Sequence, residues 1–255
     1  MNLYIVTGTT KGLGKALADA LAREPENEVI TLSRAPQARQ AGQRNYFMEL
    51  AQTHPIPAVF ARALADCSQQ RYERIVLINN AGIVMPVGPL AKCDPAAIET
   101  NLQVNLIAPF VLMQQFIELT RPMSASRLVI NISSGAGRRP VADWSAYCTA
   151  KAGLEMVSRV AALEAGRGEP GLSVCSLAPG VIDTAMQAQV RSISTDDFPD
   201  VNRFRAMKAD GALKSADDVA DAILKLDREG VFGNGGAYDI RELLAAVPPV
   251  RSAPD

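Results

Sequence analysis

The segment SSGAGRRPVADWSAYCTAK, residues 133–151, gathers side chains that could do chemistry. Tyr147 carries a phenol that can donate a proton, although its reference pKa of about 10 is high for proton exchange near neutral pH. Lys151, four residues later, falls on the same face of a helix, and its positive charge would favour the phenolate. Ser134 adds a hydroxyl that can bind a ligand oxygen. Together they indicate a proton-transfer site, whereas singly they could begin an amphipathic helix or fill a loop.

A glycine-rich turn lies near the N-terminus. The run VTGTTKGLGKALADAL has glycines at Gly8, Gly12 and Gly14 and leads into a helical pattern. Glycine permits a tight bend and the close approach of a ligand, and the free N–H groups at a helix start favour a phosphate. The turn therefore predicts a dinucleotide site that includes Thr10 and Leu13, although its TGxxxGxG spacing differs from GxGxxG. A tight turn without a ligand is the alternative.

The end of the second predicted strand indicates which dinucleotide would bind. A site for NAD places an acid there to hold the ribose 2′-hydroxyl. This chain has Ser33 and Arg34 instead, and Lys11 lies within the glycine turn. Two cations suit the 2′-phosphate, so the sequence predicts NADP(H); two solvated surface cations are the alternative.

Short apolar runs alternate with longer helical patterns along the chain. This alternation predicts a single-domain α/β Rossmann fold, with a doubly wound, mostly parallel seven-stranded sheet and helices on both faces. We expect one domain over residues 1–245, a polar substrate-loop insertion at 183–214 and a flexible tail at 246–255. The expected strands are residues 2–6, 28–33, 45–49, 74–79, 127–132, 172–177 and 236–240, and the expected helices lie near 11–24, 55–70, 95–120, 144–166 and 215–229.

The bulk composition argues against several classes of function. A net charge of −1 predicts no affinity for nucleic acid or an anionic membrane. The four cysteines are scattered, so we expect a reduced cytoplasmic protein with no disulfide framework and no metal site. No apolar run is expected to approach the ~18 residues of a membrane span. The single histidine, His54, lies in a proline-flanked turn away from the motifs.

Six motifs follow one another in the order typical of one enzyme family. They are TGTTKGLG at 7–14, NNAG at 79–82, Asn105 in LQVNL, ISS at 132–134, YCTAK at 147–151 and PGVIDT at 179–184. On these motifs the chain resembles the short-chain dehydrogenases/reductases over nearly its whole length. The stretches DWSAYCTAKAGLEM, PGVIDTAMQ, MKADGALKSADDVADAILKL and GGAYDIRE resemble the group of sepiapterin reductases and bacterial benzil reductases.

The resemblance implies a role for each residue of the central set. Tyr147 would be the general acid, and Ser134 would bind the substrate oxygen beside it. Lys151 would also bind the nicotinamide ribose, and Asn105 would hold a water that passes protons to Lys151. This set predicts the reduction of a carbonyl group by a nicotinamide.

Further cofactor contacts follow from the same resemblance. Asn79 would join adjacent strands, whereas the next three residues would pass under the adenosine ribose. The third strand is expected to end in Glu49-Leu50, where the family commonly has an Asp and an apolar residue near the adenine. The segment 35–44 leaves little room for a crossover helix. The additional contacts expected are Leu50, Asn80, Ala81, Gly82, Pro179, Gly180, Ile182, Thr184 and Met186.

The substrate is expected to be a small carbonyl compound. Trp144 could place a flat apolar face over an aromatic substrate, or it could anchor the helix start. In sepiapterin reductases an aspartate near the last strand holds the pterin ring, and Asp239 is expected to match it. The candidate substrate residues are Met85, Ser134, Ala136, Arg138, Trp144, Tyr147, Val181, Met186 and Asp239.

The sequence thus predicts an NADPH-dependent carbonyl reductase for a dicarbonyl or α-hydroxycarbonyl that is aromatic or pterin-like. The alternatives are a hydroxysteroid or 3-ketoacyl-type ketoreductase and a catalytically idle NADPH-binding sensor, because a fold does not fix a function. The resemblance also implies a homodimer, or a tetramer built from it, paired through the helices near 95–120 and 144–166. Packing of these helices only on their own sheet is the alternative.

Overall fold

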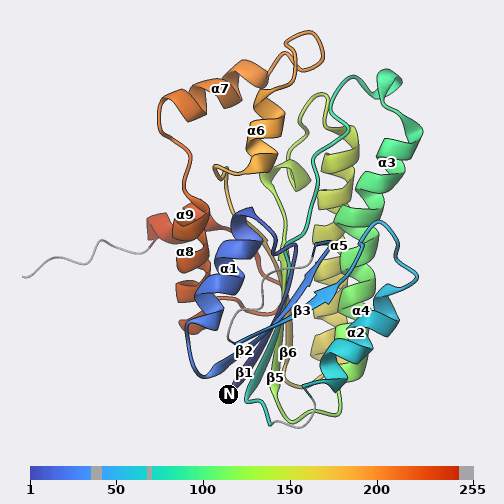
Figure 1. Ribbon diagram of the computed structural model, residues 1–255, viewed down its shortest axis with the longest axis vertical. Helices are drawn as coiled ribbons and strands as arrows, with labels where there is room; N and C mark the ends of the chain where they lie inside the picture. The colour runs from blue at the N-terminus through green and yellow to red at the C-terminus, as the bar shows by residue number, and fades with distance from the viewer. Residues whose placement is uncertain (36–41, 68–70, 247–255) are drawn as a thin grey trace, which may run out of the picture.

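The computed structural model describes residues 1–35, 42–67 and 71–246 of the 255-residue chain. A seven-stranded sheet of order β3-β2-β1-β4-β5-β6-β7 forms its centre, and every neighbouring pair of strands is parallel (Figure 1). The predicted single-domain Rossmann fold is confirmed, and its sheet is wholly parallel. The strands are β1 (Asn2–Thr7), β2 (Asn27–Ser33), β3 (Gln43–Phe47), β4 (Arg74–Asn79), β5 (Ser126–Ile132), β6 (Leu172–Ala178) and β7 (Ala237–Asp239).

Helices cover both faces of the sheet, because each parallel strand returns to the next through a crossover. On one face lie α1 (Gly12–Ala22), α8 (Ala216–Arg228) and α9 (Ile240–Ala246); on the other lie α2 (Ile56–Ala65), α4 (Ala108–Thr120) and α5 (Ser145–Gly168) (Figure 1). A separate apolar core fills the space under each set of helices. Beyond one end of the sheet stand α3 (Pro95–Leu102), α6 (Ala185–Arg191) and α7 (Val201–Ala209).

The strand order reverses between β1 and β4, and this switch point positions the site. Crossovers on either side of it lead to opposite faces of the sheet, which leaves a crevice at the carboxyl ends of the strands. The chain that follows β1, β4, β5 and β6 borders this crevice, as the glycine turn, NNAG, ISS and PGVIDT do. A third apolar cluster, which includes Trp144 and Phe198, closes the crevice from above.

Several predicted boundaries are wrong by a few residues. The third strand runs over Gln43–Phe47 and ends before Glu49, because Phe47, opposite Ser33, is the last residue in register with β2. Residues 35–44 are expected to be too few for a crossover helix between β2 and β3. Residues 36–41 of this segment lie outside the described residues. The pairing of β2 with β3 across this link is parallel. Residues 247–255, which make up most of the predicted tail at 246–255, also lie outside the described residues.

The helix expected near 95–120 is interrupted. Residues Gln103–Ile107 form a π-helical stretch, η2, between α3 and α4, in which the N–H of Ala108 bonds to the carbonyl of Gln103, five residues back. Contrary to expectation, Pro95–Thr120 has the length and hydropathy of a membrane span, with a mean hydropathy of 1.3 over its most apolar window. A core helix of a globular protein passes the same test, and α4 packs against the sheet here through Leu112 and Phe116.

Candidate active site

The glycine turn follows β1 and holds its shape through the predicted glycines. Gly8 and Gly12 have φ values of +73° and +61°, which side chains disfavour. A Cβ at Gly8 would lie 2.8 Å from the Cα of Ala81, so the turn packs directly on the chain after β4. A Cβ at Gly14 would lie 2.3 Å from the carbonyl of Gly8, which places Gly14 behind the turn rather than along the cavity described next.

One cavity of about 600 Å³ runs along the carboxyl ends of the strands. The start of α1 opens onto it, and the residue before this helix, Lys11, provides no side-chain cap for its N–H groups. The N–H groups at a helix start favour a phosphate, so phosphate binding at this turn stays a prediction. The predicted cofactor contacts that line this cavity are Gly8, Thr10, Lys11, Gly12, Leu13, Ser33, Arg34, Glu49, Leu50, Asn80, Ala81, Gly82, Tyr147, Lys151, Pro179, Gly180, Ile182, Thr184 and Met186.

Two cations meet at one end of the cavity. Lys11, from the glycine turn, and Arg34, from the end of β2, both line it together with Ser33. The Arg34 guanidinium is largely exposed and lies 3.9 Å from a carboxylate oxygen of Glu49, while the other oxygen of Glu49 accepts the N–H of Ala51 at 3.1 Å. The residues present fit a phosphate-bearing dinucleotide: a glycine cradle, the start of a helix and basic side chains lie along one wall.

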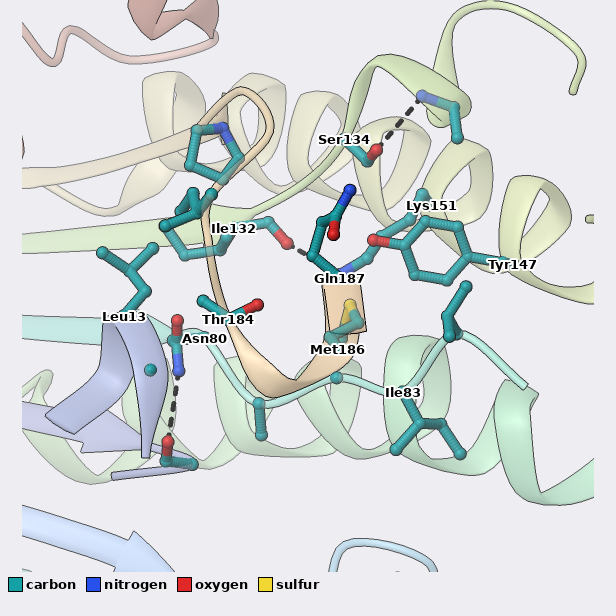
Figure 2. A pocket seen from close by; sticks show the side chains of 18 of the residues that line it. Leu13, Asn80, Ile83, Ile132, Ser134, Tyr147, Lys151, Thr184, Met186 and Gln187 are labelled. Atoms are coloured by element: carbon teal, nitrogen blue, oxygen red, sulfur yellow. Dashed lines mark hydrogen bonds between the residues drawn. The ribbon is translucent and has the colours of Figure 1, made fainter. Parts of the chain in front are cut away.

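The central residues Ser134, Tyr147 and Lys151 line the same part of the cavity (Figure 2). Ser134 follows β5, whereas Tyr147 and Lys151 lie one turn apart in α5. Burial raises the pKa of Tyr147 to about 12, while a hydrogen bond with Ser134 acts in the opposite direction. The Tyr147 phenol is therefore protonated at neutral pH and can donate a proton.

Lys151 is buried beside the phenol. Its Nζ donates to the carbonyl of Ile132 at 2.8 Å and lies 5.7 Å from the centre of the Tyr147 ring. Burial lowers the pKa of Lys151 to about 8. In the protein alone, desolvation is the largest influence on the pKa of Tyr147 and raises it. That the charge of Lys151, together with that of an oxidised nicotinamide, lowers this pKa stays a prediction.

Asn105 lies in the π-helical stretch η2 and is fully buried. Its Nδ2 donates to the main-chain carbonyl of Ile83 and to the side-chain Oδ1 of Asn101, both at 2.8 Å. Its Oδ1 accepts the N–H of Ile83 at 3.0 Å. These bonds hold the chain after β4, so the Asn105 carboxamide does not line the cavity. A water relay from this residue to Lys151 stays a prediction.

Asn79 joins strands, as predicted. Its Nδ2 donates to Asn131 Oδ1 at 2.8 Å, which links β4 to β5. Asn80 instead ties the chain after β4 to β1, because its Nδ2 donates to the carbonyl of Thr7 at 2.9 Å. These side-chain amides hold in place the chain after β4, along which a dinucleotide would lie.

The other end of the cavity is apolar and aromatic. Trp144 packs edge-on against Tyr147, with 5.6 Å between ring centres, and stacks on Phe204 of α7 at 5.5 Å. Phe198 completes the cluster at 5.8 Å from Trp144. Ala136, Val181 and Met186 also line the cavity, and their contact with a substrate stays a prediction. Trp144 immediately precedes α5 and also lines the cavity, so its contact with an aromatic substrate stays a prediction.

Three predicted substrate residues do not line the cavity. Met85 is 36% exposed on the outside of its loop. Arg138 donates to the carboxylate of Glu155 at 3.0 Å, which turns it toward α5. Asp239 is buried, but its carboxylate accepts from the Arg241 guanidinium at 2.9 Å, and Arg241 is the residue of this pair that reaches the cavity.

Sequence reasoning also missed residues that line the cavity. Arg139, Gln187, Arg203, Phe204 and Arg241 are the clearest examples. Gln187 stands next to the predicted Met186 in PGVIDTAMQ, so the motif itself carried a signal. Phe204 lies in a polar segment without apolar periodicity, and no pattern in the sequence indicates that it meets Trp144.

The comparisons with known proteins agree with this geometry. The model of the short chain dehydrogenase family matches residues 2–194. A benzil reductase ((S)-benzoin forming) of Bacillus subtilis is 38% identical over 245 residues, covering 96% of this chain and all of the relative. A sepiapterin reductase of Meriones unguiculatus is 31% identical over 258 residues, covering 92% and 94% of the two chains.

A solved structure, a 4-hydroxyisoleucine dehydrogenase complexed with NADH, shares the fold with a TM-score of 0.77 at 20% identity. It covers 94% of this chain and 96% of its own. The expected resemblance to benzil and sepiapterin reductases is confirmed by the relatives found. On the family match over most of its length, the chain belongs to the short-chain dehydrogenases, oxidoreductases that bind a nicotinamide cofactor.

Proposed function

We propose that this protein is an NADPH-dependent carbonyl reductase that acts on a small dicarbonyl or α-hydroxycarbonyl compound with an aromatic group. The observation that carries the proposal is the convergence of Ser134, Tyr147 and Lys151 in one cavity between a phosphate-binding turn and an aromatic wall. Two curated relatives of this chain are benzil reductases, which act on an aromatic diketone.

The residues of the chain would divide the chemistry as follows. A bound nicotinamide dinucleotide supplies the hydride. The hydroxyls of Ser134 and Tyr147 bind the substrate oxygen, and the phenol of Tyr147 delivers the proton as charge develops on that oxygen. Protonated Lys151 stabilises the phenolate that remains, and its bond to the Ile132 carbonyl holds it in position.

Two features support NADPH over NADH. Lys11 and Arg34 bring positive charge to one end of the cavity, and Ser33 stands where a site for NAD would have an acid. Glu49 offsets part of the Arg34 charge at 3.9 Å, so the preference is expected to be moderate.

The test measures consumption of NADPH and NADH with benzil, 1-phenyl-1,2-propanedione, sepiapterin and a 3-ketoacyl thioester. NADPH-specific turnover of the diketones supports the proposal. Turnover of the thioester alone would favour a 3-ketoacyl-type reductase. Tight NADPH binding without turnover of any carbonyl compound would favour a sensor.

We further propose that the protein is a cytoplasmic homodimer. Five large apolar side chains stay exposed on the outer faces of η2, α4 and α5, between 37% and 66% accessible: Ile107, Phe110, Met156, Val160 and Leu163. Large exposed apolar side chains gathered on neighbouring helices are typical of an interface. Light scattering that gives a monomer at micromolar concentration would reject the dimer.

A further inference from the structure

The cavity wall contains a polar side chain that the proposed chemistry does not use. Gln187 lies in the first turn of α6, is only 5% exposed and lines the cavity. Figure 2 shows its carboxamide extending from α6 toward the region of Ser134 and Tyr147. Gln187 therefore lines the same cavity as Ser134 and Tyr147.

The hydrogen bonds of Gln187 are incomplete. Its Nε2 donates to the carbonyl of Phe204 at 3.4 Å, which is long for an N–H···O bond. Its Oε1 is buried and has no partner among the residues that the structure describes. A carboxamide offers two donors and an acceptor, and buried polar groups in native proteins are usually paired. A ligand that supplies the missing partner would satisfy the side chain.

We propose that the Gln187 carboxamide binds the second oxygen of the substrate, on the carbon next to the one that is reduced. This inference rests on the proposed carbonyl reduction at Tyr147. The hydroxyls of Ser134 and Tyr147 fix the reacting oxygen, and the aromatic group lies against Trp144 and Phe204. The adjacent oxygen is then directed to the α6 wall, where Nε2 donates to a carbonyl or Oε1 accepts from a hydroxyl.

The assignment selects a substrate class. A vicinal dicarbonyl or α-hydroxycarbonyl completes the bonds of Gln187, whereas a ketone with one oxygen leaves them open. A site built to hydrogen-bond a polar group discriminates strongly against an analogue that lacks it. The competing explanation is that Gln187 only joins α6 to α7 through the Phe204 carbonyl.

Two matched substrates separate these explanations. 1-Phenyl-1,2-propanedione and 2,2,2-trifluoroacetophenone are both activated phenyl ketones, but only the first has a second oxygen. The value of kcat/KM with NADPH is measured for each in the wild type and in Gln187→Met, which keeps the length of the side chain without its amide. Gln187→Glu retains an acceptor but loses the N–H donors. Gln189→Met, on the exposed side of the same helix, is the control.

We expect Gln187→Met to lower the ratio of kcat/KM, dione over trifluoroketone, by about 10- to 100-fold. Gln187→Glu should lower the same ratio, and Gln189→Met should leave it unchanged. An equal loss of kcat/KM on both substrates would show that Gln187 only joins the helices, and unchanged values of kcat/KM on both would show that it does not contact the substrate; either result overturns the inference. A wild type that reduces neither compound would instead overturn the proposed function.

Discussion

The two ends of the cavity are built in different ways. At the dinucleotide end, main-chain groups of the glycine turn and the start of α1 form the surface, and Gly8 touches Ala81 so closely that no side chain fits. At the substrate end, side chains from α5, α6 and α7 form the surface, with Trp144 and Phe204 in contact. Main-chain recognition suits a cofactor shared by a family, whereas side-chain recognition allows each member its own substrate.

The largest expected effect comes from a variant that sharply lowers turnover at the substrate end and leaves cofactor binding at the dinucleotide end nearly unchanged. Tyr147→Phe removes the proton donor and should lower kcat by about 10²–10⁴-fold. NADPH binding should stay nearly intact, because the phosphate-binding turn lies at the other end of the cavity. Stopped-flow turnover and fluorescence titration with NADPH measure the two quantities separately. Near-normal turnover would remove Tyr147 from its proposed role.

The reverse experiment weakens the dinucleotide end alone. Arg34→Ala should weaken NADPH binding by about 1.5–3 kcal/mol, as expected for a lost hydrogen bond to a charged group. NADH binding should hardly change, so it is the internal control. The relative preference among carbonyl substrates should also stay the same. Equal losses for both cofactors, measured by titration, would mean that Arg34 supports the fold instead of the 2′-phosphate.

A third change tests whether the glycine turn is as rigid as its contacts indicate. Gly14→Ala places a Cβ 2.3 Å from the Gly8 carbonyl and should destabilise the protein by about 1–3 kcal/mol or more. Gly166→Ala in α5 is the matched control, because no atom lies within 4 Å of its added Cβ, and it should be neutral or slightly stabilising. Thermal unfolding of both variants gives the answer; a similar Tm would show that the turn adapts.

The smallest expected effect concerns pH. Burial lowers the pKa of Lys151 from 10.5 to about 8, so between about pH 8 and 10 the unfolded chain holds more protons than the folded one. This residue therefore makes the free energy of unfolding rise with pH in that window. Lys151→Met should remove that rise and, at pH 7 without cofactor, stabilise the protein by about 1–2 kcal/mol.

Urea unfolding at pH 7, 8 and 9 measures this dependence in both proteins. Parallel curves for the wild type and Lys151→Met would contradict the burial of a charged lysine. Above pH 10 the raised pKa of Tyr147 acts in the opposite direction, because the folded state then keeps a proton that the unfolded chain releases.

The sheet and the dinucleotide end could be predicted because their signals are local. Glycines with positive φ, a helix start and apolar strands all lie within a few residues of one another, and each follows from backbone sterics. The spacing of Tyr147 and Lys151 fixes one helix face in the same way. Arg34 and Glu49 also line the cavity. Glu49 does so although the third strand, which the sequence predicts to include it, ends at Phe47.

The substrate end could not be predicted to the same depth, because its contacts join distant segments. Asp239 pairs with Arg241 two residues away, and nothing in the sequence distinguishes that pairing from an open carboxylate. Trp144 and Phe204 meet only because α7 folds over the carboxyl end of the sheet. Gln187 was next to a predicted residue and was still missed, because its orientation depends on where α6 begins.

The π-helical stretch at Gln103–Ile107 gives the chain one place where it can change length without turning α4. Such a stretch contains one residue more than a regular helix would need over the same turn. Deleting one residue there would restore regular bonding and leave the helix downstream in nearly the same angular phase, so Leu112 and Phe116, which are fully buried, would stay against the sheet. Deleting one residue within α4, where the bonding is already regular, would instead turn everything downstream by about 100°. A change of length is therefore tolerated better at the π-helical stretch than within α4.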